Sequence, residues 1–448
     1  MGSNVCPIDF RYGREPMKKI FTEDNRLQKY LDVEAALARV HSKQGTIPEA
    51  SAAEISKKAT TDLVKVKRVK ELEAETKHDV MAVVRALVEQ CDDEAGKYIH
   101  LGATSYDIVD TAVALQLQEV VGILREDLVF LQGTLADLAD KHKATVMMGR
   151  THGQFAVPIT FGLKIAVYAM EITRHLQRLD ECTPRICVGK MSGAVGTGAS
   201  YGQNALELQT MVMNELGLKA DDASTQIVTR DRHLEFLSLL ANIATSLEKF
   251  ATEIRNLQRS ELMEAAEAFD AKKQVGSSTM AHKKNPITTE NVSSLARLVR
   301  GFLTPMFENA IQWHERDLAN SAGERFIIPH MCILTDDILV KMNTVFKNLA
   351  VYPENMQRNL DLSRGTIMAE SVMIALVEKG IGRDDAYKIV RECSHEANEN
   401  GVTFLEILEK NETVTNALSS EELKAAVDPK NYLGSSEKIV DNIVKKIK

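Results

Sequence analysis

A run of small residues followed by two lysines is the first segment that could carry out chemistry. Residues 276–286 read Gly-Ser-Ser-Thr-Met-Ala-His-Lys-Lys-Asn-Pro; the small residues favour a loop, and Asn-Pro favours the start of a helix. We expect Lys283 and Asn285 to lie at the positive end of that helix, where backbone N–H groups and the helix dipole favour an anion. A linker with an ordinary helix cap is the alternative for this segment taken alone.

Two further segments contain a histidine or a cluster of hydroxyl groups. In residues 149–154, His152 stands between two small residues and is expected to lead into a helix. Because imidazole titrates near neutral pH, His152 could act as a general acid or base. In residues 100–107, Thr104 and Ser105 precede a long helical pattern, so they could cap a helix or bind a carboxylate. A hydrogen-bonded structural histidine and simple capping are the respective alternatives.

A fourth segment, residues 313–325, concentrates charge beside an aromatic side chain. It holds Trp313, which is the only tryptophan of the chain, together with Arg316 and Arg325. Guanidinium groups suit bidentate contacts with carboxylate or phosphate, so this segment is a candidate anion site. A surface charge cluster is the alternative.

Long helices must position these segments. Apolar residues recur at alternating spacings of four and three in three stretches, a pattern typical of helices that pack at a shallow angle. The first stretch contains Leu117, Val121, Leu124, Leu128, Leu131, Leu135 and Leu138, the second spans residues 240–257, and the third begins at Pro286. No stretch predicts a large sheet. We therefore expect an all-α fold of three helical domains, residues 1–106, 107–352 and 353–448, with a long central helix bundle.

Composition and motif content argue against several classes of protein. A net charge of −8 at pH 7 and a pI of about 5.9 argue against a nucleic-acid binder. The sequence contains no P-loop, dinucleotide fingerprint or H-E-x-x-H motif, and its six cysteines lack metal-site spacing, so we expect no cofactor and no metal. No apolar stretch approaches membrane-spanning length and no signal peptide is visible, so we expect a cytoplasmic protein without a membrane partner.

Taken together, the four segments resemble the fumarase/aspartase superfamily, whose loop signature is S-S-x-M-P-x-K-x-N. The match runs through Thr104-Ser105, residues 149–152 and the loop from Ser277 to Asn285. Within the superfamily the chain is most similar to the adenylosuccinate lyase branch, on the strength of residues 11–12, 76–80, 191–197, 230–233 and 313–325. Ala281 stands where the signature has proline, a difference that bears on how the loop closes.

The resemblance implies an enzyme that eliminates fumarate from adenylosuccinate to give AMP, and from the succinylated aminoimidazole carboxamide ribotide (SAICAR) to give AICAR, in purine nucleotide biosynthesis. It implies a homotetramer that shares a central helix bundle, with each active site built from three chains, and no cofactor. Four residues match the catalytic positions: Ser277 as the base, His152 as the acid, Lys283 beside the developing charge, and Glu290 as the acidic partner of the histidine. The positions around the succinyl group and the nucleotide correspond to Arg11, Tyr12, Lys77, His78, Asp79, His100, Thr104, Ser105, Gln226, Asn285, Arg316, Ser321 and Arg325.

Two other functions stay open at this point. A sister lyase would act on argininosuccinate, aspartate or malate, or a related cycloisomerase on its own substrate, and affinity for ligands that contain AMP would separate these from the first reading. A non-catalytic structural relative or a helical scaffold would need none of the catalytic residues. The presence of Ser277, His152, Lys283 and Glu290 together argues against that second class.

Overall fold

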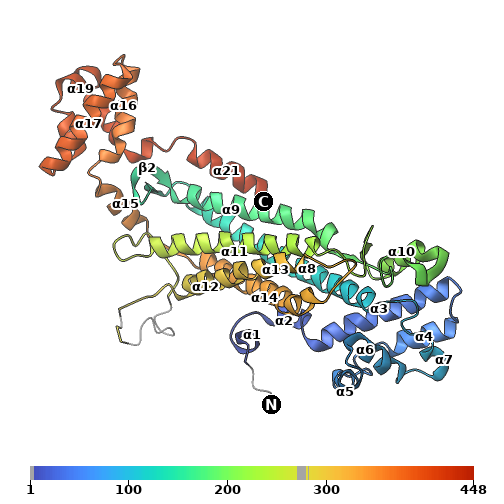
Figure 1. Ribbon diagram of the computed structural model, residues 1–448. Coiled ribbons are helices and arrows are strands. Elements are labelled where there is room, and N and C mark those ends of the chain that lie inside the picture. Colours follow the sequence, from blue (N-terminus) through green and yellow to red (C-terminus); the bar gives the residue numbers. More distant parts are fainter. Residues whose placement is uncertain (1–4, 270–278, 281) are drawn as a thin grey trace. The chain divides into compact units, whose positions relative to one another are not determined.

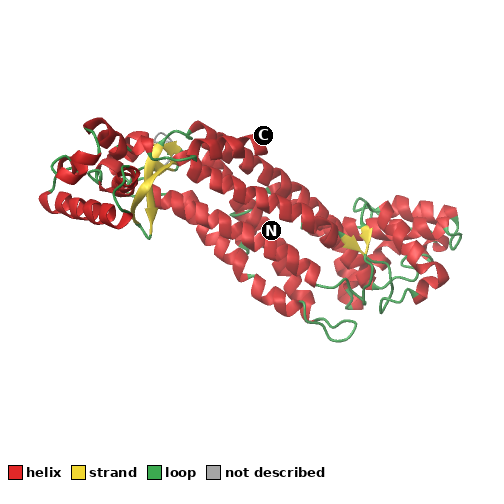
Figure 2. Cartoon of the chain, turned by 90° about the horizontal axis from the view of Figure 1, so that it is seen from above, coloured by secondary structure: helices red, strands yellow, loops and turns green. Residues whose placement is uncertain are grey.

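Helices dominate the computed structural model, which describes residues 5–269, 279–280 and 282–448. Figure 2 shows long helices with only a few short strands among the described residues. The predicted all-α fold class is confirmed. None of the helices in the described ranges is long and apolar enough to cross a membrane.

The chain divides into two compact units. Unit 1 comprises residues 1–128, 175–246 and 294–340, and unit 2 comprises residues 129–174, 247–293 and 341–448. Five long helices have residues in both: α8 (Ser105–Lys141), α9 (Phe161–Ile186), α11 (Asp231–Leu257), α12 (Ile287–Gly301) and α14 (Ala319–Lys347). The three-domain division expected from the sequence stays a prediction.

The predicted apolar patterns lie within these long helices. Leu124, Leu128, Leu131 and Leu135 of α8 are fully buried, and so are the apolar residues at corresponding spacings in α11. Burying one such side chain contributes about 1.5–3 kcal/mol to the free energy of unfolding. The alternating spacing of four and three places these side chains on one face of a helix, so this spacing specifies the helices. The helices expected from the three patterns are therefore confirmed.

Shorter helices complete unit 1. They are α1 (Pro7–Phe10), α2 (Glu15–Ile20), α3 (Glu23–Lys43), α4 (Glu49–Lys58), α5 (Val66–Thr76), α6 (Asp79–Val88), α7 (Asp93–Gly96), α10 (Ala205–Glu215) and α13 (Leu303–Asn309). A 3₁₀ turn, η1 (Ala199–Asn204), and a parallel pair of two-residue strands, β3 (Val188–Gly189) and β4 (Lys219–Ala220), lie between them. Helix α3 packs against α4, as Figure 1 shows, and carries eleven buried residues.

Unit 2 contains two antiparallel strand pairs and a C-terminal group of helices. The strands are β1 (Val146–Thr151) with β2 (Gln154–Thr160), and β5 (Ala265–Ala266) with β6 (Ala350–Val351). The helices are α15 (Pro353–Asp361), η2 (Thr366–Met368), α16 (Ala369–Glu378), α17 (Arg383–Asn400), α18 (Phe404–Leu408), α19 (Glu412–Ala417), α20 (Ser420–Val427), η3 (Pro429–Asn431) and α21 (Ser436–Ile447). Helices α16 to α20 share one apolar core that includes Leu376 and Phe404.

The hairpin formed by β1 and β2 corrects one sequence expectation. Residues 149–154 were expected to lead into a helix, but α9 begins only at Phe161, after β2. His152 and Gly153 occupy the two-residue turn with φ of 54° and 75°, the positive values that a type I′ hairpin turn requires. The strands are short and their register shifts between Met148 and Arg150, so they show no clear alternation of apolar and polar residues.

Candidate active site

Unit 1 contains a cavity of about 520 Å³ that gathers many of the predicted site residues. It is lined by Glu73, Lys77, His78, Asp79, Ser105, Tyr106, Gln226, Arg316, Asp317, Leu318, Ser321 and Arg325. Eight of these were predicted from the sequence, and they come from the α5–α6 corner, the start of α8, the segment before α11 and the segment that leads into α14. The wall carries three cationic side chains, Lys77, Arg316 and Arg325, beside three carboxylates, Glu73, Asp79 and Asp317. Its two guanidinium groups suit bidentate contacts with an anion.

The corner between α5 and α6 positions three of the lining residues. Lys77 ends α5 in a left-handed conformation, with φ of 55°, and turns the chain. His78 is the N-cap of α6, and its Nδ1 accepts a hydrogen bond from the backbone N–H of Met81 at 3.3 Å. Because Nδ1 is the acceptor, a neutral His78 carries its proton on Nε2, which lies 3.4 Å from Ser105 Oγ. The tautomer of His78 is thus set by the helix it caps.

Arg316 is held against an aromatic ring inside the same cavity. Its guanidinium carbon lies 3.5 Å from the centroid of the Tyr106 ring, and its Nη1 donates to Gln226 Oε1 at 2.8 Å. The Tyr106 hydroxyl donates to Ser321 Oγ at 3.4 Å. Tyr106 was missed in the sequence analysis, although it directly follows Ser105. It serves as the platform that orders Arg316 and Ser321.

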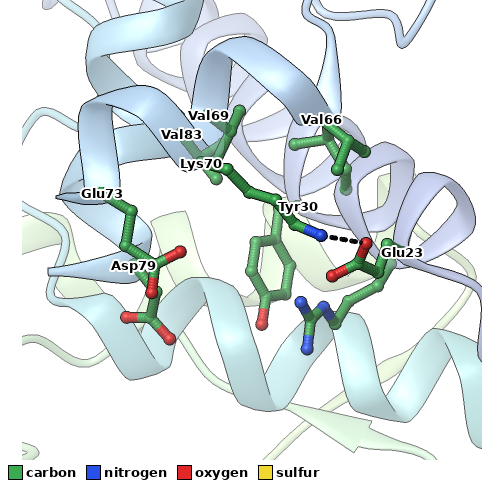
Figure 3. Close-up of a pocket in the computed structure, with 10 residues that line it drawn as sticks. Glu23, Tyr30, Val66, Val69, Lys70, Glu73, Asp79 and Val83 are labelled. Atoms are coloured by element: carbon green, nitrogen blue, oxygen red, sulfur yellow. Dashed lines mark hydrogen bonds and ion pairs between the residues drawn. The ribbon is translucent and has the colours of Figure 1, made fainter. Parts of the chain in front are cut away.

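Asp79 and Arg325 form an ion pair at the edge of this cavity. Arg325 Nη2 donates to Asp79 Oδ2 at 2.7 Å. Behind Asp79 lies a second, small pocket, and Figure 3 shows Tyr30 in it between Glu23 and Asp79, with Lys70 paired to Glu23 at 2.5 Å. Burial raises the pKa of Tyr30 to about 12, so its hydroxyl stays protonated. Because Asp79 accepts a hydrogen bond from Arg325, Arg325 already has a carboxylate partner without a ligand.

A buried charge pair holds the loop that carries Thr104. Asp107 and Lys190 are both fully buried, and Lys190 Nζ lies 2.5 Å from Asp107 Oδ1. The carboxylate of Asp107 also accepts hydrogen bonds from four other donors: the backbone N–H groups of Thr104 at 2.9 Å, Ser192 at 3.0 Å and Gly193 at 3.1 Å, and the Tyr201 hydroxyl at 3.2 Å. Thr104 itself does not line the cavity. Asp107 and Lys190 were not among the predicted site residues.

The remaining predicted residues of unit 1 lie outside the cavity lining. His100 stands on the loop before α8 with its Nδ1 2.6 Å from Glu34 Oε1. Arg11 and Tyr12 follow α1, and Arg14 anchors this segment, with its Nε donating to Asp336 Oδ2 at 3.0 Å. The structure therefore does not bring Arg11, Tyr12 or His100 to the wall of the described cavity.

Of the predicted catalytic residues, the structure describes His152, Lys283 and Glu290, which lie in two places in unit 2. His152 is exposed at the tip of the β1–β2 hairpin. At the base of the turn, Arg150 makes a bidentate ion pair with the buried Glu264, with both N–O distances at 2.8 Å. Such a pair fixes orientation as well as position, so it ties the hairpin to the strand segment at β5. Glu264 was not predicted from the sequence.

Lys283, Asn285 and Glu290 line a cavity of unit 2. Other residues of its wall include Gln258, Glu267, Phe269 and Tyr352. His152 is not part of this wall. Ser277, Ser278 and Ala281 lie outside the described residues.

The start of α12 already has an anionic partner. The helix begins at Ile287, two residues after Asn285. The backbone N–H groups of Thr288 and Thr289 donate to the carboxylate of Glu267, at 3.2 Å and 2.7 Å. A carboxylate of the chain itself thus occupies two of the amides that were expected to favour an anion.

Two family models and many known proteins match this chain. Residues 9–301 match a family described as lyase, and residues 365–443 match the adenylosuccinate lyase C-terminus. Adenylosuccinate lyases from Pyrococcus abyssi and Methanothermobacter thermautotrophicus are 51% and 48% identical to it over 440 residues, which cover 98% of this chain in both cases and 97% and 98% of theirs.

Solved structures of related enzymes agree with the fold. A fumarate lyase from Mesorhizobium sp. BNC1 has a TM-score of 0.90 and 34% identity, and the match covers 97% of this chain and 98% of that one. The 3-carboxy-cis,cis-muconate lactonizing enzyme from Pseudomonas putida has a TM-score of 0.90 and 33% identity, with 98% of each chain covered. Because the near-full-length relatives named above are adenylosuccinate lyases and the C-terminal family model agrees with them, this chain belongs to the adenylosuccinate lyase family of carbon–nitrogen lyases.

Proposed function

We propose that this chain converts adenylosuccinate into AMP and fumarate, and SAICAR into AICAR and fumarate, as a cytoplasmic enzyme of purine nucleotide biosynthesis. The observation that carries the proposal is the cavity of unit 1, where the side chains of Lys77, Arg316 and Arg325 converge with hydroxyl and amide groups. Its volume of about 520 Å³ lies in the range of small-molecule sites, and its two guanidinium groups suit a ribotide phosphate. The relatives that share nearly the whole chain carry the corresponding name.

The chemistry begins with a proton on the succinyl carbon next to a carboxylate. This C–H bond is very weakly acidic, so the enzyme must bind the dianion that forms more tightly than it binds the substrate. Ser277, as its alkoxide, accepts this proton and becomes a hydroxyl, and the electron pair of the C–H bond forms the double bond of fumarate as the C–N bond breaks. His152 donates a proton to the leaving nitrogen, which becomes the amino group of AMP.

Lys283 supplies the positive charge for the dianion in this scheme. Two helix-end amides are taken by Glu267. The ammonium of Lys283 lines the unit 2 cavity together with Asn285 and Glu290, and three further cations, Arg255, Arg259 and Lys284, lie in the same wall. Glu290 has the role of the acidic partner of His152. The negative charge of Glu290 favours the protonated form of the imidazole in this scheme. Thr104 and Ser105 have the role of binding a succinyl carboxylate.

The proposal is tested by mixing the purified protein with adenylosuccinate and following the purine ultraviolet band together with fumarate. We expect both signals to change in equal molar amounts. Parallel samples with argininosuccinate, aspartate and malate test the sister activities. Fumarate release from one of these three in preference to adenylosuccinate would contradict the assignment.

Replacing Arg325 by alanine is expected to raise KM for adenylosuccinate at least about tenfold, with a smaller effect on kcat. A charge-assisted hydrogen bond contributes about 1.5–3 kcal/mol, and the substrate phosphate takes the place of Asp79 as the partner of Arg325 in this proposal. Steady-state kinetics measure both constants. Arg185→Ala is the matched control, since Arg185 is equally exposed and pairs with Glu235 away from the cavity. An unchanged KM in the Arg325 variant would remove it from the phosphate site.

We also propose that four copies of the chain assemble and that side chains from three subunits build each active site. Support comes from large exposed apolar side chains concentrated between residues 298 and 326: Leu298, Phe307, Ile311, Trp313, Leu318 and Phe326. So many large apolar side chains left exposed in one stretch of the chain favour a surface that a partner subunit covers.

Light scattering during size-exclusion chromatography is expected to give four times the chain mass of 49.7 kDa. Trp313 is 75% exposed in one chain and is the only tryptophan, so its emission reports on this surface. We expect the emission to shift to the red when dilution dissociates the assembly. A monomeric mass at micromolar concentration would contradict the proposal.

A further inference from the structure

The side-chain amide of Gln258 joins two backbone segments that line the same cavity of unit 2. Its Nε2 donates to the backbone carbonyl oxygen of Lys284 at 3.0 Å, and its Oε1 accepts a hydrogen bond from the backbone N–H of Glu267, also at 3.0 Å. A glutamine amide is both a donor and an acceptor, and here the two functions serve two different segments. This bridge fixes how far the backbone of Lys284 lies from that of Glu267.

Both supports of the bridge belong to regular structure. Gln258 directly follows α11, and its backbone N–H donates to the carbonyl oxygen of the buried Ile254 at 2.9 Å. Glu267 directly follows Ala266, which belongs to strand β5 and is buried. Side chains that helices and strands support are placed more precisely than side chains on loops. The amide of Gln258 therefore relates the position of Lys284 to a helix and a strand.

The carboxylate of Glu267 extends this support to the start of α12. It accepts hydrogen bonds from the backbone N–H groups of Thr288 and Thr289, and from the hydroxyl of Thr289 at 2.7 Å. Thr289 is fully buried. The next residue is Glu290, which lines the cavity. Gln258 and Glu267 thus hold the residues on both sides of Pro286.

Lys284 is held at its backbone and at its side chain. Its Nζ lies 5.5 Å from the centroid of the Phe269 ring, within the range of a cation–π contact. Its carbonyl group, which Gln258 binds, belongs to the same planar peptide unit as the backbone nitrogen of Asn285. Lys283 and Asn285 flank Lys284, and both line the cavity. Fixing Lys284 therefore restricts where these two side chains can lie.

We propose that Gln258 is a positioning residue of the elimination reaction, which holds Lys283 and Asn285 in place beside the reacting succinyl group. It does so through the backbone of Lys284. The inference rests on the proposed function, because that function gives Lys283 its part in the reaction. Gln258 lines the cavity, but its amide is engaged with the backbone on both sides and does not act on the substrate. The competing explanation is a pair of hydrogen bonds that only stabilises the fold.

The test is the kinetics of Gln258→Met, since methionine has a similar length but replaces neither hydrogen bond. We expect kcat for adenylosuccinate to fall about tenfold, because a small misplacement of Lys283 weakens its interaction with the developing charge. KM is expected to change less than about threefold, since this loss falls on the transition state. Calorimetric titration is expected to show unchanged AMP affinity, because Arg316 and Arg325 lie in the unit 1 cavity.

A second measurement follows the bridge without using activity. Hydrogen exchange, read by mass spectrometry on the peptide that spans residues 282–290, is expected to be faster in Gln258→Met than in the wild type. Gln258 is partly exposed, so its removal lets water reach the freed backbone groups and is expected to leave the urea midpoint close to that of the wild type.

Two controls separate positioning from folding. Gln118→Met removes a similar bond, from the amide of Gln118 to the carbonyl oxygen of Gly217 at 3.1 Å, at a site outside both cavity walls. This control is expected to keep its kcat and its exchange rates in residues 282–290. In a Lys283→Met background, Gln258→Met is expected to cause little further loss of kcat, because Gln258 acts through Lys283.

An unchanged kcat in Gln258→Met, or an equal loss of kcat in both backgrounds, would refute the positioning role. Parallel losses of kcat and of AMP binding sites per chain would assign Gln258 to the fold alone. A wild-type protein that releases no fumarate would instead contradict the proposed function. In that case, faster exchange confined to residues 282–290 of Gln258→Met would still show that Gln258 holds the segment that contains Lys283 and Asn285.

Discussion

Replacing Ser277 or His152 by alanine is expected to lower the turnover of adenylosuccinate at least about a hundredfold, the lower end for general acid–base groups. Ser277→Ala removes the base that accepts the proton from carbon, and His152→Ala removes the acid that protonates the leaving nitrogen. Continuous measurement of fumarate at saturating substrate gives kcat for both variants. His395→Ala, at an exposed position in α17, is the matched control and is expected to keep its turnover.

Exchange of the substrate C–H proton with deuterated water separates the two roles. We expect exchange to persist in His152→Ala, because carbon deprotonation does not need the acid, and to be lost in Ser277→Ala. Near-normal fumarate release by the Ser277 variant would overturn its assignment as the base. Loss of exchange in both variants to the same extent would mean that the two steps are not divided between these residues as proposed.

Replacing Lys190 by methionine is expected to lower the free energy of unfolding by about 3–5 kcal/mol. Methionine keeps the length of the side chain but removes the charge, which leaves the carboxylate of Asp107 fully buried without its cation. Backbone N–H groups and Tyr201 still donate to this carboxylate, but they do not supply a full charge. Urea unfolding at a fixed protein concentration measures the effect.

Lys164→Met is the control for this stability prediction. Lys164 pairs with Glu253 at 2.6 Å, but both side chains are partly exposed, so the expected change is below about 1 kcal/mol. Combining Lys190→Met with Asp107→Asn is expected to restore part of the loss, because the uncompensated charge is then gone. Equal urea midpoints for Lys190→Met and Lys164→Met would contradict the assigned cost of burying the charge.

The helices of this fold could be predicted because their signal is local. The apolar spacing in α8 repeats over residues 117–138, and the structure buries the side chains of that pattern at Leu124, Leu128 and Leu131. The hairpin that presents His152 could not be predicted, because strands of six and seven residues with a shifted register leave too few alternations to detect.

The candidate site was predictable where chemistry-bearing residues stand close together in the sequence. The arginines at 316 and 325 were identified this way, whereas residues 77–79 came from the resemblance to the family, and the structure gathers all of them at one cavity. The side chains that hold them were not predictable. Lys190 lies 83 positions from Asp107, and Glu34 lies 66 positions from His100, and no periodic pattern links a buried ion to a partner so far along the chain.

Few amino acids can replace His152 without disturbing the β1–β2 turn, because the backbone at the tip of this hairpin is left-handed. Asparagine, aspartate and glycine adopt φ near 54° at low cost, whereas a β-branched side chain there is strained by roughly 1–2 kcal/mol. The activity lost in a His152→Val variant would therefore reflect both a misplaced hairpin and the missing acid. Asparagine is the cleaner deletion, since it removes the titrating group and leaves the turn able to form.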